Sequence, residues 1–148
     1  IEAEPMRREA LQEELEQDLR DMGIDADVSQ NDKGVSISID SIHFYPDSER
    51  MLPGEEYKLR RISNILRKHS GRDILVTGHT ADVGRADAQQ ELSENRAATV
   101  GQFFIEDGAR RREQIVIQGV GGSQPVAPNS TEAGRKQNRR VEITLLEN

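Results

Sequence analysis

Residues 74–108, ILVTGHTADVGRADAQQELSENRAATVGQFFIEDG, contain a short apolar run, a loop and a long segment with helical spacing. The run Ile74-Leu75-Val76 is typical of an inner strand that is covered on one or both faces. A loop at 78–84 follows this strand, and a helix is expected from about residue 86 to residue 107. Another apolar run at 115–117 predicts a second strand. Two strands joined through a helix need a crossover connection, so we expect them to be parallel.

The flanking sequence adds helices and strands on both sides of this unit. Apolar residues recur every three or four positions at 4–22 and 54–68, which predicts two amphipathic helices. Three further strands are expected, at 26–30, at 35–44 with a bulge near residue 40, and at 140–146. The segment before the last strand is expected to be irregular and to end in a polar turn. This order predicts an α+β fold, with a mixed parallel and antiparallel sheet and the helices packed on one face.

The composition excludes several classes of protein. The 148 residues are 34% hydrophobic and 3% aromatic, and 20 Lys and Arg against 27 Asp and Glu give a net charge of −7. This balance argues against a nucleic-acid partner, which needs a clustered positive face. The sequence has no cysteine for a disulfide or a thiolate metal site, and no apolar run approaches the roughly 20 residues of a membrane span.

The length fits one domain with a short addition. We expect residues 31–148 to form the domain, and residues 1–30 to form an N-terminal helix and lead-in segment. Because the chain begins with Ile1 and not with methionine, we also expect it to be a piece of a longer protein whose export signal has been removed.

Arg96 is the most informative residue of the helix expected at 86–107. At 100° per residue it falls inside the arc of apolar side chains, with Gln89 beside it. A guanidinium on the buried side of a helix is costly unless it is paired or opens onto a polar pocket. One interpretation is that Arg96 extends to the sheet edge or pairs with an internal carboxylate. The other is that Arg96 binds an anion at the floor of a cleft, where its planar fork suits a carboxylate.

Asp82 is the second candidate, because it lies in the loop between the buried strand and this helix. Ligands gather beyond the carboxyl ends of parallel strands in such sheets. A carboxylate at Asp82 and a guanidinium at Arg96 would suit a ligand that carries both an ammonium and a carboxylate. The alternative is that Asp82 or Asp87 caps the start of the helix.

No pattern indicates an enzyme, a cofactor or a metal. His79 and Asp82 are not accompanied by a third residue at the sequence spacing typical of metal ligands, so no metal site is expected. The glycines at 119–122 do not form a dinucleotide-binding fingerprint, and there is no nucleophile elbow. The three arginines at 110–112 are predicted to be a solvent-exposed helix exit, where cations suit the helix dipole.

Several ordered blocks closely resemble the OmpA-like C-terminal domain, the family of OmpA-, Pal- and MotB-like domains. The resemblance runs from about residue 35 to residue 146. The blocks are Gly78-His79-Thr80, Gly84, LSENRA at 92–97, Gly119-Val120-Gly121, Pro125, Asn129, Gly134-Arg135 and NRRVEI at 138–143. The resemblance implies a non-enzymatic, periplasmic domain of a diderm cell envelope, in a lipoprotein or membrane-protein fragment associated with the outer membrane. It also implies non-covalent binding of the peptidoglycan stem peptide.

The resemblance also implies where the ligand lies. In the family, the diamino acid of the stem peptide sits between an Asp directly after His-Thr and the Arg of the Leu-Ser-x-x-Arg-Ala block. The Arg is Arg96, but the Asp position holds Ala81, and Asp82 comes one residue later. The family Asn seven residues before the Arg is Gln89, and the acidic residue of the loop after the first strand is Asp47.

Two functions follow from these residues. In the first, the domain anchors its parent protein to the cell wall: Arg96 holds the carboxylate of the stem peptide, Asp82 holds the ammonium, and backbone groups around Thr80 and Asp47 complete the cleft. In the second, Ala81 marks a degenerate pocket, and the domain is a scaffold that contacts other envelope proteins without binding the wall. The block at 138–140 is expected to serve the fold, with one of Arg139 and Arg140 on the core side and the other exposed or paired with an acid.

Overall fold

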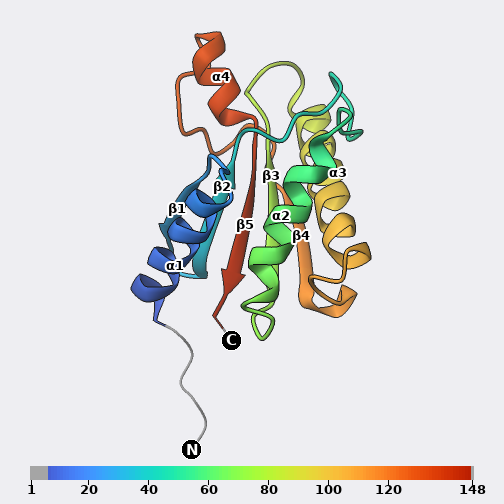
Figure 1. The fold of residues 1–148 in the computed structure, drawn as a ribbon. Helices are drawn as coiled ribbons and strands as arrows, with labels where there is room; N and C mark the ends of the chain where they lie inside the picture. The colour runs from blue at the N-terminus through green and yellow to red at the C-terminus, as the bar shows by residue number, and fades with distance from the viewer. Residues whose placement is uncertain (1–6, 148) are drawn as a thin grey trace, which may run out of the picture.

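The computed structural model describes residues 7–147, which form one five-stranded sheet with helices against it (Figure 1). The strand order is β1-β2-β5-β3-β4. The strands are β1 (Asp27–Gln30), β2 (Gly34–Ile39), β3 (Ile74–His79), β4 (Ile115–Gly119) and β5 (Arg140–Leu146). β3 and β4 are parallel, and the other neighbouring pairs are antiparallel. The predicted mixed sheet and its parallel pair are therefore confirmed.

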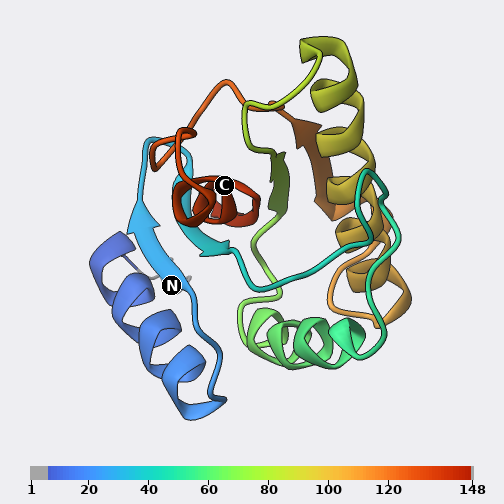
Figure 2. The same cartoon turned by 90° about the horizontal axis from the view of Figure 1, so that it is seen from above.

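Three long helices lie along one face of the sheet, as Figure 2 shows from above. They are α1 (Arg8–Asp21), α2 (Glu55–Arg67) and α3 (Ala86–Glu106). A short helix, α4 (Glu132–Asn138), lies over the upper end of the sheet in Figure 1. No helix within residues 7–147 is long and apolar enough to cross a membrane.

The core lies between the three long helices and the sheet. Apolar residues four positions apart on α1 meet the sheet because they share one helical face. The same spacing buries a stripe on α2 and on α3. The buried helix residues include Leu11, Leu15, Leu19, Leu59, Ile62, Leu66, Ala97, Val100 and Phe104. Val35, Ile37, Val76, Ile143 and Leu145 supply the sheet side of this core. On the other face of the central strands, Ser36 and Thr144 face each other in register, and their hydroxyls are 2.6 Å apart.

The N-terminal segment is joined to the sheet and to the core. Leu11, Leu15 and Leu19 of α1 are buried, and β1 pairs with β2 along four residues. The boundary expected between residues 30 and 31 lies in the turn of this hairpin. The predicted first turn of the helix, residues 4–6, lies outside the described residues.

Two predictions about local structure are wrong. The polar turn before the last strand is the helix α4, which begins where Thr131 Oγ1 accepts a hydrogen bond from Gly134 N at 3.0 Å. Seven residues carry too little apolar periodicity for such a helix to be recognised from sequence. The strand predicted at 35–44 ends at Ile39, because the chain then crosses toward α2, where Lys58 Nζ donates to Ser41 O at 2.7 Å.

The predicted solvent-exposed exit of α3 is wrong for Arg110. This residue is 3% exposed, and its guanidinium donates to four backbone carbonyl oxygens. These acceptors are Arg72 O (2.7 Å), Leu66 O (2.9 Å), Ala109 O (2.7 Å) and His69 O (2.7 Å). Arg110 thereby joins the turn after α2 to the turn after α3, whereas Arg111 and Arg112 are exposed.

Candidate ligand-binding site

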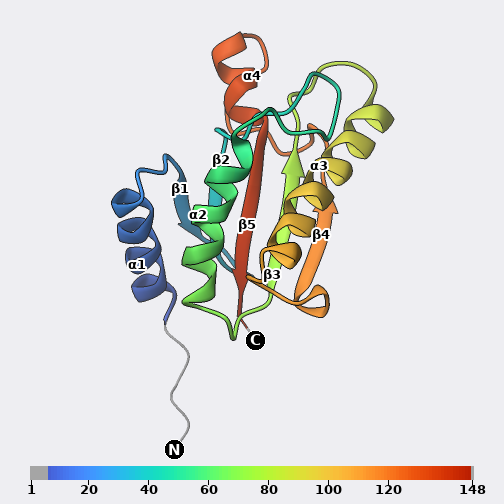
Figure 3. The ribbon, with the colours of Figure 1, turned by 45° about the vertical axis from the view of Figure 1, so that its right-hand side comes forward.

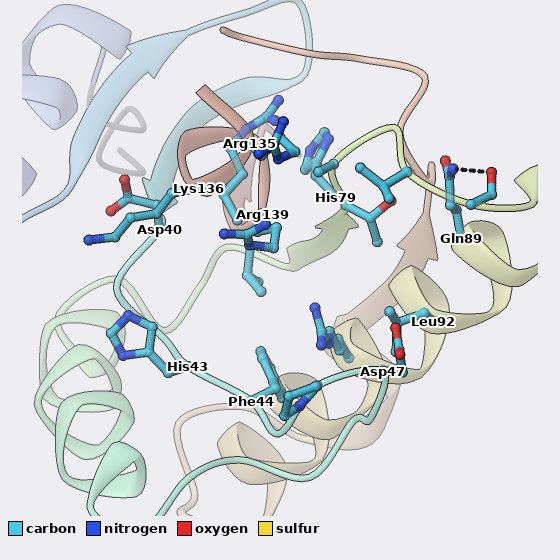
Figure 4. A pocket seen from close by; sticks show the side chains of 18 of the residues that line it. Asp40, His43, Phe44, Asp47, His79, Gln89, Leu92, Arg135, Lys136 and Arg139 are labelled. Carbon is cyan, nitrogen blue, oxygen red and sulfur yellow. Dashed lines mark hydrogen bonds between the residues drawn. The ribbon is translucent and has the colours of Figure 1, made fainter. Parts of the chain in front are cut away.

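A cavity of about 880 Å³ lies at the end of the sheet where β3 finishes and β5 starts (Figure 4). Four segments line it: the loop after β2, the loop after β3, the first half of α3, and α4 with the start of β5. The lining residues used below are Phe44, Asp47, Thr80, Ala81, Gln89, Arg96, Arg139 and Arg140. The carboxyl end of β3 is the edge where the sequence predicted a ligand, and the volume is in the range of small-molecule sites.

Arg96 is half-buried and lines this cavity. Its Nε donates to Ser48 O at 2.9 Å, its terminal nitrogen lies 3.4 Å from Tyr45 O, and its guanidinium lies 4.8 Å from the centre of the Phe44 ring. Across residues 7–147 no carboxylate is close enough for an ion pair with Arg96. A guanidinium has five N–H donors, so this arrangement leaves several of them without a protein acceptor.

Burial lowers the pKa of Arg96 below the ordinary arginine value, and the carboxylate of Asp47 opposes this shift. Asp47 is exposed, lines the cavity and has a positive φ of 53°. Aspartate tolerates this left-handed conformation better than most residues, which explains an acid at this position of the loop. Asp47 is therefore the carboxylate with the largest influence on Arg96.

The loop after β3 forms another wall of the cavity. Thr80 is buried, and its Oγ1 has no hydrogen-bond partner within the described part of the chain. Its backbone N donates to Gly121 O at 2.9 Å, which fixes the loop against the β4–α4 connection. Ala81 is 6% exposed and also lines the cavity. The position where the resemblance implies an aspartate thus presents a methyl group here.

Asp82 is not among the residues that line the cavity. Its Oδ1 accepts a hydrogen bond from Gln89 Nε2 at 3.3 Å, and its backbone N donates to Asn129 Oδ1 at 3.2 Å. Gln89 Nε2 also donates to Gly84 O at 3.0 Å, the dashed contact in Figure 4. The structure therefore brings Arg96, Thr80, Ala81, Gln89 and Asp47 to one cavity, but it directs Asp82 toward the amide of Gln89.

A buried asparagine supports this loop from behind. Asn138 accepts hydrogen bonds from Val126 N (2.7 Å) and Ala127 N (3.0 Å), and it donates to Ala127 O (2.9 Å) and Asn129 Oδ1 (2.8 Å). Because Asn129 also accepts from Asp82 N, the two asparagines connect α4 to the cavity loop. Asn138 thus serves the fold, as expected.

Two glycines of the recognised blocks allow close backbone contacts. A Cβ on Gly78 would lie 2.1 Å from Ser93 O, and one on Gly134 would lie 1.8 Å from Pro128 O. Glycine at 78 therefore lets β3 approach α3, and glycine at 134 lets α4 pack on the preceding loop. Both contacts bring together elements that carry lining residues of the cavity.

The cavity carries more positive than negative charge, although the whole chain is acidic. Its basic residues are Arg85, Arg96, Arg135, Lys136, Arg139 and Arg140, and its carboxylates are Asp40, Asp47 and Glu132. The polar turn expected after residue 134 gave no indication that α4 contributes basic side chains to the cavity. Such a local excess of positive charge attracts anions.

Several of these cations are already paired. Arg139 forms an ion pair with Glu132, and Arg140 is buried and donates to Glu142 Oε1 at 3.0 Å and to Gln124 O at 3.0 Å. His79 Nε2 also lies 3.3 Å from Glu142 Oε1. Contact with His79 first, and with Arg140 second, holds the pKa of Glu142 below the ordinary glutamate value. Arg96 differs from Arg139 and Arg140 in having no such partner.

Comparisons with known proteins agree with this fold. The family model described as the OmpA family matches residues 43–139. Outer membrane porin F of Pseudomonas fluorescens is 33% identical over 111 residues, which are 75% of this chain and 33% of the porin. The outer-membrane lipoprotein YfiB of Pseudomonas aeruginosa is 35% identical over 115 residues, or 77% of this chain and 68% of YfiB.

Among solved structures, the cell wall anchor of the type VI secretion system (T6SS) of P. aeruginosa superposes with a TM-score of 0.76 at 26% identity, covering 96% of this chain and all of that one. The relatives include outer-membrane, lipoprotein and periplasmic proteins, which confirms the predicted location in the cell envelope. The family match also confirms the expected domain type, an OmpA-like domain. This chain spans about a third of the length of porin F.

Proposed function

Because this chain belongs to the OmpA family, we propose that it is a periplasmic domain that binds the peptidoglycan stem peptide without covalent chemistry and tethers its parent protein to the cell wall. The observation that carries this proposal is Arg96, a half-buried guanidinium that opens onto a cavity and has no carboxylate partner in the described chain. Burying such a charge is energetically costly unless a bound ligand supplies the missing negative charge.

In this proposal Arg96 binds a carboxylate of the diamino acid in the stem peptide. Charge-assisted hydrogen bonds of this kind are among the strongest in proteins, and the planar fork of arginine suits a carboxylate. The unpartnered hydroxyl of Thr80 supplies a further polar contact at the same cavity. The excess of positive charge around the cavity favours the approach of an anionic ligand.

The ammonium of the diamino acid needs an acid, and the two candidates differ in position. Asp82 would have to turn from Gln89 before it could reach the cavity. Asp47 already lines the cavity and is the acid with the largest electrostatic effect on Arg96. We therefore assign the ammonium contact to Asp47 and the positioning of the loop to Asp82.

Sedimentation with purified sacculi tests wall binding. We expect the wild-type domain to co-sediment and Arg96→Ala to reduce its apparent affinity by about tenfold or more, because charge-assisted hydrogen bonds are lost. Arg60→Ala is the matched control, since Arg60 is exposed on α2 and does not line the cavity. Equal sedimentation of the wild type and Arg96→Ala would contradict the proposal.

The second function, a scaffold that acts through contacts with envelope proteins, is favoured by Ala81 and by the orientation of Asp82. Titration with stem-peptide fragments separates the two. Fragments with diaminopimelate, whose side chain ends in an ammonium and a carboxylate, should shift the amide resonances of Thr80, Ala81 and Arg96. Fragments with lysine, which lacks that carboxylate, should bind more weakly. A domain that responds to neither fragment is a scaffold.

A further inference from the structure

A second polar cluster lies between α1 and the turn after α2. It is formed by Glu14 and Asp18, one helical turn apart on α1, and by His69. The two helices are neighbours in Figures 2 and 3, and His69 follows the end of α2 that is remote from the cavity. None of the three residues lines the cavity.

Two groups in this cluster are buried without a hydrogen-bond partner. The His69 side chain is 9% exposed, and its Nε2 has no partner within residues 7–147. The Asp18 side chain is 12% exposed, and its Oδ2 is buried and unpartnered as well. Buried polar atoms in native proteins are nearly always satisfied, so two adjacent exceptions point to a group that completes both.

The geometry suits a small cation. One ligand atom from each residue lies within 4.8 Å of the others, and His69 Nε2 is 3.9 Å from Glu14 Oε2. Ligands of tetrahedral zinc, with bonds of about 2.0–2.1 Å, are roughly 3.4 Å apart, so small side-chain movements would close the site. Lys68 Nζ contacts Asp18 Oδ1 at 3.0 Å, which leaves Oδ2 available.

The backbone around His69 is fixed before any ion binds. His69 N donates to Leu66 O at 3.0 Å, and His69 O accepts from Arg110 at 2.7 Å. Arg110 also holds Leu66 O, so the turn that presents the imidazole is anchored at two carbonyls. Because the backbone of this turn is already held in place, less conformational entropy would be lost when an ion binds.

We propose that His69 Nε2, Asp18 Oδ2 and the Glu14 carboxylate form a zinc site, with water as the fourth ligand. The imidazole selects zinc over magnesium or calcium, which prefer all-oxygen sites. The bound ion joins α1 to the end of α2 and so fastens the N-terminal helix to the domain. This proposal is independent of wall binding, because it uses none of the cavity residues.

Calorimetric titration of the full chain with zinc chloride tests the site. We expect one ion per chain and, at free zinc one hundred times the Kd, a rise in Tm of roughly 5–10 °C that EDTA reverses. Cobalt substitution should give the visible absorption of a tetrahedral site. Absence of binding at millimolar zinc, or equal binding of calcium and zinc, would overturn the proposal.

Matched variants locate the ion. Glu14→Gln and His69→Gln should each weaken zinc binding by at least about tenfold, whereas Glu13→Gln, on an exposed neighbour, should not. Lys68→Met should strengthen binding, because it removes an ammonium beside the ion and frees Asp18. Full zinc binding by His69→Gln would place the ion elsewhere and refute the assignment. Sacculus binding should be the same with and without EDTA.

Discussion

Arg96 and Arg110 lie on and just beyond α3, and both guanidiniums are withdrawn from water, but their surroundings differ. Four backbone carbonyls surround Arg110. Arg96 has one short hydrogen bond, one longer contact and the face of Phe44. Burial lowers the pKa of both arginines, and no ion pair with a described residue compensates either of them.

The difference separates a structural arginine from a binding one. The guanidinium of Arg110 donates to four carbonyls inside the protein, so it stabilises the turns after α2 and α3. It has no exposed donors with which to bind a ligand. Arg96 retains donors that face a cavity, so its interactions are completed only from outside. The number of guanidinium N–H groups without a protein acceptor therefore distinguishes a binding arginine from a structural one better than burial does.

The largest effect is expected from Arg110→Met. This change removes four hydrogen bonds to backbone carbonyls, of which Leu66 O and His69 O keep a backbone N–H donor, and we expect the free energy of unfolding to fall by about 3 kcal/mol. Urea unfolding measures this loss, with Arg111→Met as the exposed control. A change below about 1 kcal/mol would mean that the four hydrogen bonds have little net value.

Arg96→Met should show the opposite behaviour. It removes one hydrogen bond and a cation–π contact but also relieves the burial of a charge, so we expect the stability to change by less than about 1 kcal/mol. The affinity for diaminopimelate fragments should fall by about 2 kcal/mol, or roughly thirtyfold. Calorimetry on the folded variant separates the two quantities. A large loss of stability would place Arg96 in the same class as Arg110.

Arg140 extends the comparison, because its partner is a carboxylate. The lowered pKa of Glu142 stabilises the fold above the ordinary glutamate pKa of about 4.3, and this contribution is lost as the pH falls through the folded-state pKa. Glu142→Gln should therefore be less stable than the wild type at pH 7. The difference in the free energy of unfolding between the two proteins should be smaller at pH 3.5. Urea midpoints at both pH values test this, and a gap that widens in acid would contradict it.

The smallest effect is expected from salt. Because positive side chains outnumber carboxylates around the cavity, raising sodium chloride from about 0.05 to 0.5 M should weaken fragment binding a few-fold through screening. The urea midpoint of the wild type should change less than the affinity for the fragment does, since the acceptors around Arg110 are uncharged carbonyls. Binding that strengthens with salt would argue that apolar contacts dominate.

Sequence patterns were sufficient for the sheet and the three long helices. The structure confirms the strands predicted from the apolar run at 74–76 and from the alternation at 140–146, and the helices predicted from three- and four-residue spacings. These patterns are reliable because they indicate which face of each element is buried. The same reasoning placed Arg96 among apolar neighbours before any tertiary contact was known. Glycines 78 and 134 were recognised as part of the family blocks, although their close contacts were not.

Only the tertiary structure decided how the polar groups are satisfied. Arg96 and Arg110 have the same side chain, and nothing local indicates that one meets four carbonyls from two turns while the other faces a cavity. The orientation of Asp82 depends on Gln89 and Asn129, which come from separate segments. Local sequence determines periodicity and hence the buried face, whereas the partners of a buried charge are set by segments that meet only after folding.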